Sequence, residues 1–198
     1  MVRTFFSSIA SAACLAAVLT IGLGGFSTAA SQEPAAARAS IAHNTLPGLA
    51  GARILGATPP GQEVDIAIGL NIANPAALDS LIDELYDPAS ARYRQFLTPA
   101  EFADQFGPSR SDYEAVVQFL EQSGMRVTAA YNNRLVIEAR ANVAQLEAAF
   151  GVKINNYSRA DQEFFANDRD PQLPASIAPM VASISGLENY LTLKSHVR

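Results

Sequence analysis

Residues 85–109, LYDPASARYRQFLTPAEFADQFGPS, contain the local signals for the end of one helix and for the whole of a second, shorter one. Asp87-Pro88 ends a helix, because proline disfavours the helical conformation of the residue before it. Thr98-Pro99-Ala100-Glu101 combines a capping box with a proline at the first helical position. This predicts a short helix that runs to about Phe106 and is ended by Gly107-Pro108.

The segment before this stretch predicts one strand and one helix. Apolar residues alternate with small or polar residues from Val64 to Ile72, as is typical of a half-buried strand. Asn74-Pro75 then supplies an N-cap and a proline at the first helical position. We expect the helix that follows to pack one face on a sheet, because four apolar residues recur with helical spacing: Leu78, Leu81, Ile82 and Leu85.

A second helix and a hairpin are predicted after this stretch. Ser111 and Glu114 form another capping box, and Gly124 is placed to end the helix that they begin. Alternating apolar residues indicate a hairpin over residues 125–139. Asn132-Asn133 can adopt the positive φ angles of its tight turn.

The last part of the pattern predicts a helix, a strand and a terminal helix. Asn142 caps a helix that Gly151 closes, and residues 152–157 form the last strand. A short helix is predicted over residues 174–185, with apolar residues on one side: Ile177, Val181 and Ile184.

The order of these elements predicts an α+β fold, a ferredoxin-like split β-α-β arrangement with an antiparallel sheet and a helical insertion. We place the folded domain at residues 62–186. Residues 31–61 show no periodic pattern and are rich in proline and glycine, so we expect a flexible lead-in there. Residues 187–198 are expected to form a C-terminal tail.

The first 30 residues predict a secretory signal peptide. Arg3 supplies a positive charge, Ile9 to Phe26 is apolar, and Ser27 to Ala30 offers a small-residue cleavage site. The alternative is an N-terminal membrane anchor, because the apolar run is nearly long enough to cross a bilayer. Cys14 is the only cysteine and lies within this segment, so we expect a secreted domain without disulfides.

The charge balance argues against nucleic-acid binding. The 198 residues include 14 Lys and Arg and 19 Asp and Glu, a net charge of −5. Nucleic-acid binding needs a concentrated basic surface, and the basic residues here are scattered. We expect no cofactor and, once the signal peptide is removed, no membrane association.

Six short motifs occur in an order that resembles one known family. From about Leu46 to Tyr190 the chain is similar to the activation domains (propeptides) of sedolisin-type serine peptidases, the kumamolisin and tripeptidyl-peptidase relatives. The motifs are Leu85–Pro88, Tyr93–Thr98, Phe106–Pro108, Asn133–Leu135, Val143–Gly151 and Asn167–Pro171. Within or between them we assign structural or interface roles to Tyr86, Tyr93, Phe96, Leu97, Thr98, Phe102, Phe106, Gly107, Arg134, Phe150 and Gly151.

The resemblance implies a domain that folds first, templates a peptidase domain and blocks its active site until cleavage. Residues 187–198 would then thread along the substrate cleft. The Ser-Gly-Thr-Ser motif of the family's peptidase domain does not occur in this sequence, so the chain itself is not expected to be an enzyme. Three explanations are open for this expectation: a gene fragment, one half of a split pair, or a free inhibitor acting in trans.

The alternative function is a secreted ferredoxin-like binding module with no role in proteolysis. Such a module should show a concave pocket with convergent polar groups. A propeptide should instead show a flat sheet face that is hydrophobic at its centre. The sequence also leaves two readings open for five apolar residues, a ligand pocket or, as we favour, core: Tyr93, Phe96, Leu97, Phe102 and Phe106.

Other groups of polar residues are weak candidates for chemistry. Asp79, Asp83 and Glu84 have helical spacing, and we interpret them as the solvated face of a helix rather than a paired-carboxylate site. His43 and His196 lie in the predicted lead-in and tail, where no rigid scaffold would hold a catalytic pair. We interpret four further carboxylates as a charged loop rather than a cation site: Asp161, Glu163, Asp168 and Asp170.

Overall fold

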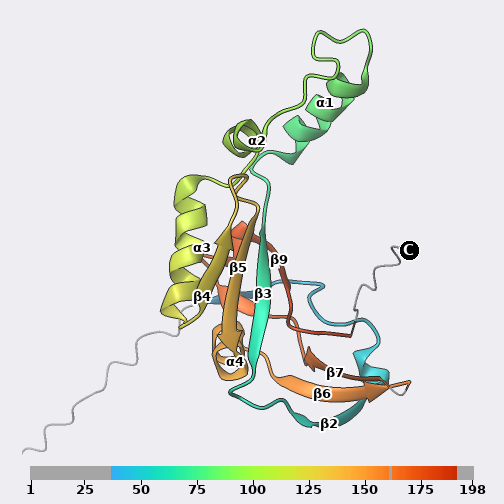
Figure 1. The fold of residues 1–198 in the computed structure, drawn as a ribbon, viewed down its shortest axis with the longest axis vertical. Coiled ribbons are helices and arrows are strands. Elements are labelled where there is room, and N and C mark those ends of the chain that lie inside the picture. Colours follow the sequence, from blue (N-terminus) through green and yellow to red (C-terminus); the bar gives the residue numbers. More distant parts are fainter. Residues whose placement is uncertain (1–36, 161, 191–198) are drawn as a thin grey trace, which may run out of the picture. The chain divides into compact units, whose positions relative to one another are not determined.

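The computed structural model describes residues 37–160 and 162–190 (Figure 1). The predicted signal peptide, Cys14, Asp161 and residues 191–198 lie outside the described residues. The elements, in chain order, are β1 (Arg38–Ser40), η1 (Leu49–Gly51), β2 (Arg53–Ala57), β3 (Glu63–Leu70), α1 (Pro75–Tyr86), α2 (Pro99–Gln105), α3 (Arg110–Gln122), β4 (Arg126–Ala130), β5 (Val136–Asn142), α4 (Val143–Phe150), β6 (Ile154–Arg159), β7 (Gln162–Asn167), β8 (Gln172–Pro174), η2 (Ala178–Met180) and β9 (Val181–Ser185).

A four-stranded antiparallel sheet forms the centre of the domain, with the strand order β4-β5-β3-β9. In the sequence, α3 lies between β3 and β4, and α4 lies between β5 and β9. Both helices share one apolar core with the sheet (Figure 1). The predicted α+β, ferredoxin-like split β-α-β fold with a helical insertion is therefore confirmed.

The core lies between the sheet and these two helices because the strands alternate. Along β3, every second side chain is buried, and the intervening ones face away from the helices. β5 follows the same rule, and α3 and α4 each contribute an apolar stripe. The largest side chains of this core that are almost completely buried include Ile68, Leu120, Ile137, Leu146 and Phe150.

The prediction for the last strand and the terminal helix is wrong. β6, at the predicted last strand, does not join the four-stranded sheet but pairs with β2 and β7 in a separate three-stranded sheet. The fourth strand of the central sheet is β9, in the segment predicted to be helical. The register of β9 on β3 shifts between Gly69 and Leu70, which marks a β-bulge. Val181 and Ile184 are therefore both buried although they are three residues apart, a spacing that imitates a helix.

The flexible lead-in predicted for residues 31–61 is also different in the structure. β1 pairs with β8, and β2 pairs with β6, so two short strands lie within this segment. Leu46 is buried in a second apolar cluster with Tyr157 and Phe164. These strands form because distant partners supply their hydrogen bonds, which local composition does not report.

The folded domain continues beyond the predicted start of the tail. Leu187 is only 2% exposed and belongs to the main core. The Asn189 N–H donates to the Phe165 carbonyl at 3.2 Å, and the Asn189 side chain accepts from Phe165 N–H at 2.8 Å. The ring of Tyr190 packs edge-on against Phe164, with 4.7 Å between the ring centroids. Residues 187–190 are therefore packed on the domain rather than forming part of a tail.

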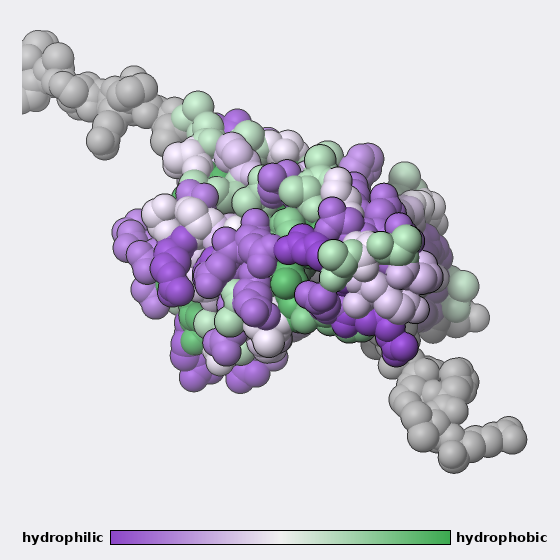
Figure 2. Space-filling model, turned by 90° about the horizontal axis from the view of Figure 1, so that it is seen from above, coloured by the Kyte–Doolittle hydropathy of each residue, from purple (hydrophilic) through white to green (hydrophobic). Residues whose placement is uncertain are grey.

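Residues 71–109, between β3 and α3, form a helical insertion with an apolar cluster of its own. Leu81 and Leu85 of α1 pack with Phe106, and Phe102 lies 5.5 Å from Phe106 between ring centroids. The prediction that α1 packs on a sheet is wrong, because its buried face meets α2 and the flanking loops. Seen from above, hydrophobic and hydrophilic areas alternate on the surface (Figure 2).

The helix caps follow the sequence with one exception. Asn74, Thr98 and Asn142 each accept a hydrogen bond from a backbone N–H in the first turn of their helix, as predicted. The predicted capping box of α3 is wrong, because Ser109 rather than Ser111 is the N-cap and accepts from Asp112 N–H at 3.0 Å.

Arg134 joins the insertion to the central sheet. Its backbone has a φ of 56°, so Arg134, and not Asn132-Asn133, takes the left-handed conformation in the β4–β5 turn. Its guanidinium donates to the Pro108 carbonyl at 3.0 Å and to the Ala103 carbonyl at 2.5 Å. An ion pair of 3.6 Å to Asp104 adds to these contacts. One cation thus neutralises the carbonyl end of α2.

Replacing Arg134 with methionine should lower the free energy of unfolding by about 2 kcal/mol, because two buried carbonyls lose a charged donor. Hydrogen exchange of the α2 amides should become faster than in the unaltered chain. The matched control is Arg126→Met, at an exposed position on β4. Unchanged exchange in α2 would show that Arg134 does not hold the insertion in place.

Candidate functional site

The face of the four-stranded sheet that points away from α3 and α4 is the main candidate for docking. Asp65 of β3 lies opposite Arg140 of β5 in the register. The Arg140 guanidinium donates to both carboxylate oxygens of Asp65, at 2.6 Å from Nε and 2.8 Å from Nη2. This hydrogen-bonded ion pair holds the pKa of the Asp65 carboxyl below its ordinary value.

Polar and small side chains make up the rest of this face. The Tyr131 hydroxyl donates to Glu138 Oε1 at 2.6 Å. This hydrogen bond and the negative charge of Glu138 raise the pKa of Tyr131. Ala67 and Gly69 occupy the outward positions of β3, because the strand directs its large residues to the core.

The expectation of a hydrophobic centre on this sheet face is therefore wrong. A shallow open depression of about 460 Å³ lies on the face. Backbone, small side chains and the Asp65–Arg140 pair line it. Such a surface can dock on a protein through shape and charge rather than through apolar burial.

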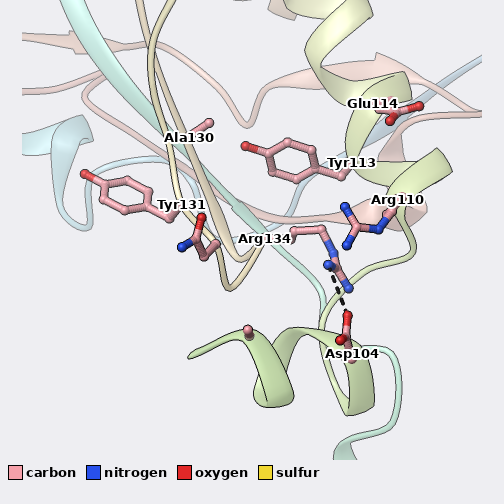
Figure 3. A pocket seen from close by; sticks show the side chains of 9 residues that line it. Asp104, Arg110, Tyr113, Glu114, Ala130, Tyr131 and Arg134 are labelled. Atoms are coloured by element: carbon pink, nitrogen blue, oxygen red, sulfur yellow. Dashed lines mark ion pairs between the residues drawn. The ribbon is translucent and has the colours of Figure 1, made fainter. Parts of the chain in front are cut away.

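A cleft of about 400 Å³ lies where the end of α2, the start of α3 and the β4–β5 turn meet (Figure 3). Arg134 points into this region but is already bound to Asp104 and two carbonyls. The Tyr113 hydroxyl is buried without a hydrogen-bond partner among the described residues. Burial raises the pKa of Tyr113. The cleft has no nucleophile beside a base, and no reaction can be assigned to it.

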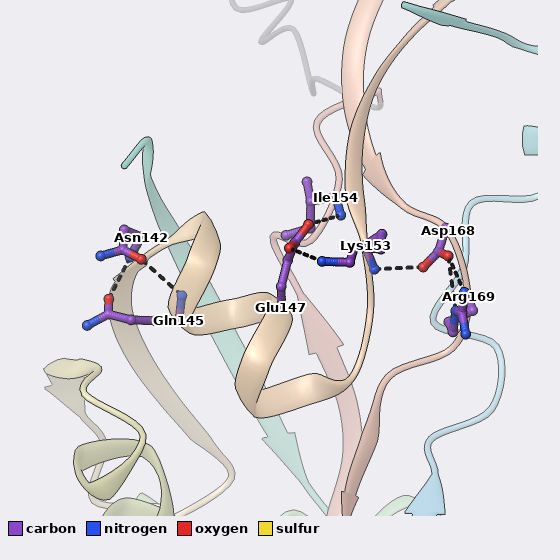
Figure 4. A network of polar contacts seen from close by, with 7 residues as sticks. All are labelled: Asn142, Gln145, Glu147, Lys153, Ile154, Asp168 and Arg169. Atoms are coloured by element: carbon purple, nitrogen blue, oxygen red, sulfur yellow. Dashed lines mark hydrogen bonds and ion pairs between the residues drawn. The ribbon is translucent and has the colours of Figure 1, made fainter. Parts of the chain in front are cut away.

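A polar network links α4 to the start of β6 (Figure 4). Glu147 accepts from Lys153 Nζ at 2.8 Å and from Ile154 N–H at 2.9 Å. Desolvation raises the pKa of Glu147, but these two donors outweigh it and leave the pKa below its ordinary value. Asp168 behaves likewise, because desolvation is outweighed by donors from Arg169 and Lys153 N–H. The lowered pKa values of Glu147 and Asp168 favour the ionised carboxylates that accept these hydrogen bonds.

Acid should weaken this network. A carboxyl with a depressed folded-state pKa stabilises the fold fully above its unfolded pKa, about 4.3 for glutamate, and loses this contribution as the pH falls through the folded value. The variant Glu147→Gln should be roughly 1 kcal/mol less stable than the unaltered chain at neutral pH. The difference should shrink below about pH 4. Urea denaturation across this range measures it, with Glu121→Gln on the exposed end of α3 as control. A stability difference between Glu147→Gln and the unaltered chain that stays constant with pH would contradict the lowered pKa of Glu147.

The weak candidates for chemistry are dispersed. Asp79 and Asp83 are exposed on α1, and Glu84 pairs with Arg92 at 3.5 Å. Asp170 accepts from the Thr45 hydroxyl at 2.7 Å. In residues 37–160 and 162–190, no group of three His, Cys, Asp or Glu side chains could hold a metal ion. Across the same ranges, no helix has both the length and the apolar character needed to cross a bilayer.

The family-motif residues fall into two groups in the structure. Three of them pack in the apolar cluster of the insertion: Leu97, Phe102 and Phe106. Three more lie on or beside α2, where Thr98 is the N-cap, Gly107 lies against the Ala103 backbone and Arg134 donates to the Ala103 carbonyl. Phe150 is in the main core, and Gly151 ends α4 with a φ of 64°. The other three are exposed: Tyr86, Tyr93 and Phe96. The prediction that Tyr93 and Phe96 belong to the core is therefore wrong.

Sequence reasoning missed Asp65 and Arg140. Each stands at an outward position of an alternating strand, and opposite charges at such positions were the available signal. Their meeting depends on the register of β3 with β5, which the sequence does not specify.

Comparisons with known proteins agree with this architecture. The chain is 36% identical over 141 residues to xanthomonalisin of Xanthomonas sp. (strain T-22). The matched region covers 69% of this chain and 17% of that protein. It is 29% identical over 129 residues to sedolisin of Pseudomonas sp. (strain 101), and the matched region covers 65% of this chain and 22% of that protein. It is 26% identical over 144 residues to tripeptidyl-peptidase 1 of Rattus norvegicus, and the matched region covers 71% of this chain and 26% of that protein.

The chain thus spans only about a sixth to a quarter of the length of these relatives. Residues 50–190 match the family described as "Pro-kumamolisin, activation domain". This match includes the whole four-stranded sheet, both core helices and the insertion. The chain therefore belongs to the pro-kumamolisin activation domain family.

Proposed function

We propose that this chain is a secreted propeptide-like domain that inhibits a sedolisin-type serine peptidase and assists its folding. It would act in cis as a piece of a longer protein, or in trans as a separate chain. The single observation that carries the proposal is the family match over residues 50–190. Activation domains of this family belong to sedolisin-type peptidases, to which the relatives above also belong.

The free sheet face suits docking on a peptidase domain. None of the described helices covers it, since α3 and α4 both pack on the opposite face. Its small central residues permit close approach of a partner backbone or helix. The Asp65–Arg140 pair supplies charges that a partner surface can complement.

Acid should loosen this docking. The pKa of the Asp65 carboxyl is lowered by Arg140, so the ion pair is intact at neutral pH and is lost as the pH falls through that lowered value. Arg140 is then left without its partner. We infer that a complex formed through this face is tighter at neutral pH than in acid.

The test is titration of the purified chain into active xanthomonalisin at about pH 7 and about pH 3, well below the ordinary aspartate pKa of about 3.9, with peptide hydrolysis and complex formation measured separately. Inhibition that is stronger at neutral pH is the expected result. Arg140→Met should weaken it, whereas Arg169→Met should not, although Arg169 also makes an exposed pair with an aspartate. Absence of inhibition at both pH values, from a folded chain, would favour a binding module unrelated to proteolysis.

A further inference from the structure

Four large side chains of the insertion are exposed to solvent. Ile82 and Tyr86 are 42% and 71% exposed on α1. Tyr93 and Phe96, in the loop that follows, are 42% and 63% exposed. We call these four residues the insertion patch. Scattered apolar residues on a surface are ordinary, but a group of aromatic ones gathered together marks an interaction site.

The loop after α1 folds back on the helix, which brings the patch together. The Arg94 N–H donates to the Leu85 carbonyl at 3.0 Å. This contact brings the backbone next to Tyr93 beside the end of α1 that carries Tyr86. Ile82 lies one helical turn before Tyr86, at the edge of the helix face that carries the buried Leu81 and Leu85.

The insertion also has a net negative charge nearly as large as that of the whole chain. Residues 71–109 contain six acidic and two basic residues, a net charge of −4, compared with −5 for all 198 residues. Within the described chain, two of the six form ion pairs, Glu84 with Arg92 and Asp104 with Arg134. Asp79 and Asp83 lie exposed on α1 beside Ile82. Carboxylates therefore border the patch on α1, while Arg92 and Arg94 flank Tyr93 in the loop.

We propose that the insertion patch is a second docking surface, separate from the free sheet face, for a basic surface with an apolar centre on a sedolisin-type peptidase domain. This inference rests on the proposed function for the identity of the partner. Charge complementarity selects the partner surface, because the acidic border would repel an acidic one. Aromatic side chains that become buried at its centre would supply most of the affinity.

The experiment measures the affinity of the full chain for xanthomonalisin directly, apart from its inhibition. Phe96→Ser should weaken binding at least about tenfold. The matched control is Ile54→Ser on β2, because Ile54 is 64% exposed and lies outside the insertion. The affinity of the Ile54→Ser variant should differ from that of the unaltered chain by less than about twofold.

A charge reversal tests the acidic border. Asp83→Lys should slow association and reduce its dependence on salt. Glu121→Lys is the control, since both residues are exposed in the last turn of a helix. Neither substitution should unfold the chain, and circular dichroism checks this.

If Phe96→Ser and Asp83→Lys both bind with the affinity of the unaltered chain, the inference is overturned. It is also overturned if the unaltered chain does not bind at all. A dimer of the unaltered chain that Phe96→Ser dissolves would also overturn it, because a second copy would then cover the patch. Patch-dependent binding without inhibition would support the second docking surface while contradicting the proposed inhibitory function.

Discussion

Replacing Phe150 with alanine is expected to lower the free energy of unfolding by about 3–5 kcal/mol, enough to unfold a marginally stable domain. Phe150 is 0% exposed and ends α4 on the core side. It lies among Ile68, Leu120 and Leu173, so its ring joins α4 to the sheet, to α3 and to β8. Truncation removes buried apolar surface and leaves a cavity that these neighbours cannot fill without moving.

Urea denaturation measures this loss, with two comparisons. Phe150→Leu keeps most of the volume and should cost roughly half as much or less. Phe96→Ala removes the same atoms from an exposed ring and should change stability by less than about 0.5 kcal/mol. Similar losses for Phe150→Ala and Phe96→Ala would contradict the assignment of Phe150 to the core.

Replacing Gly186 with alanine is the second large effect, an expected loss of roughly 2–4 kcal/mol. Gly186 follows β9 with a φ of 95°, which side chains rarely adopt. A Cβ atom there would lie 2.3 Å from the Asp65 carbonyl oxygen and 3.0 Å from Ile66 Cα. Since both neighbours are backbone atoms of β3, the end of β9 would have to move away from the sheet.

The same substitution should also disturb the docking face, because Asp65 carries the carboxylate that binds Arg140. We expect weaker binding to a sedolisin-type peptidase together with lower stability. Gly61→Ala is the control, since no atom lies within 4 Å of the position and its φ is not in the left-handed region. It should be neutral or slightly stabilising. A stable, fully binding Gly186→Ala variant would show that β9 tolerates displacement.

Features set by neighbouring residues were predictable. Asn74, Thr98 and Asn142 cap helices in the structure as they do in the sequence pattern. The alternation in β3 correctly identified a strand with one buried face. These signals depend on contacts within one turn or one strand, so the local sequence contains all their partners.

Features set by distant partners were not predictable. Val181 and Ile184 have helical spacing, yet a bulge against β3 makes the segment a strand. β2 has no buried side chain and is held in place by β6, far away in the sequence. Phe96 and Phe102 are both phenylalanines of the insertion, but only Phe102 packs with Phe106 in the apolar cluster.

The sequence by itself determined the order of the elements from β3 to β6, most helix caps and the family motifs, and with them the ferredoxin-like class. Only the tertiary structure decided which strand completes the central sheet, that residues 187–190 belong to the domain, and which aromatic residues remain exposed. The physical reason is the range of the interactions. Caps and periodicity act over three or four residues, whereas strand register and burial depend on side chains more than a hundred residues apart, such as the pairing of Ile68 with Ile184.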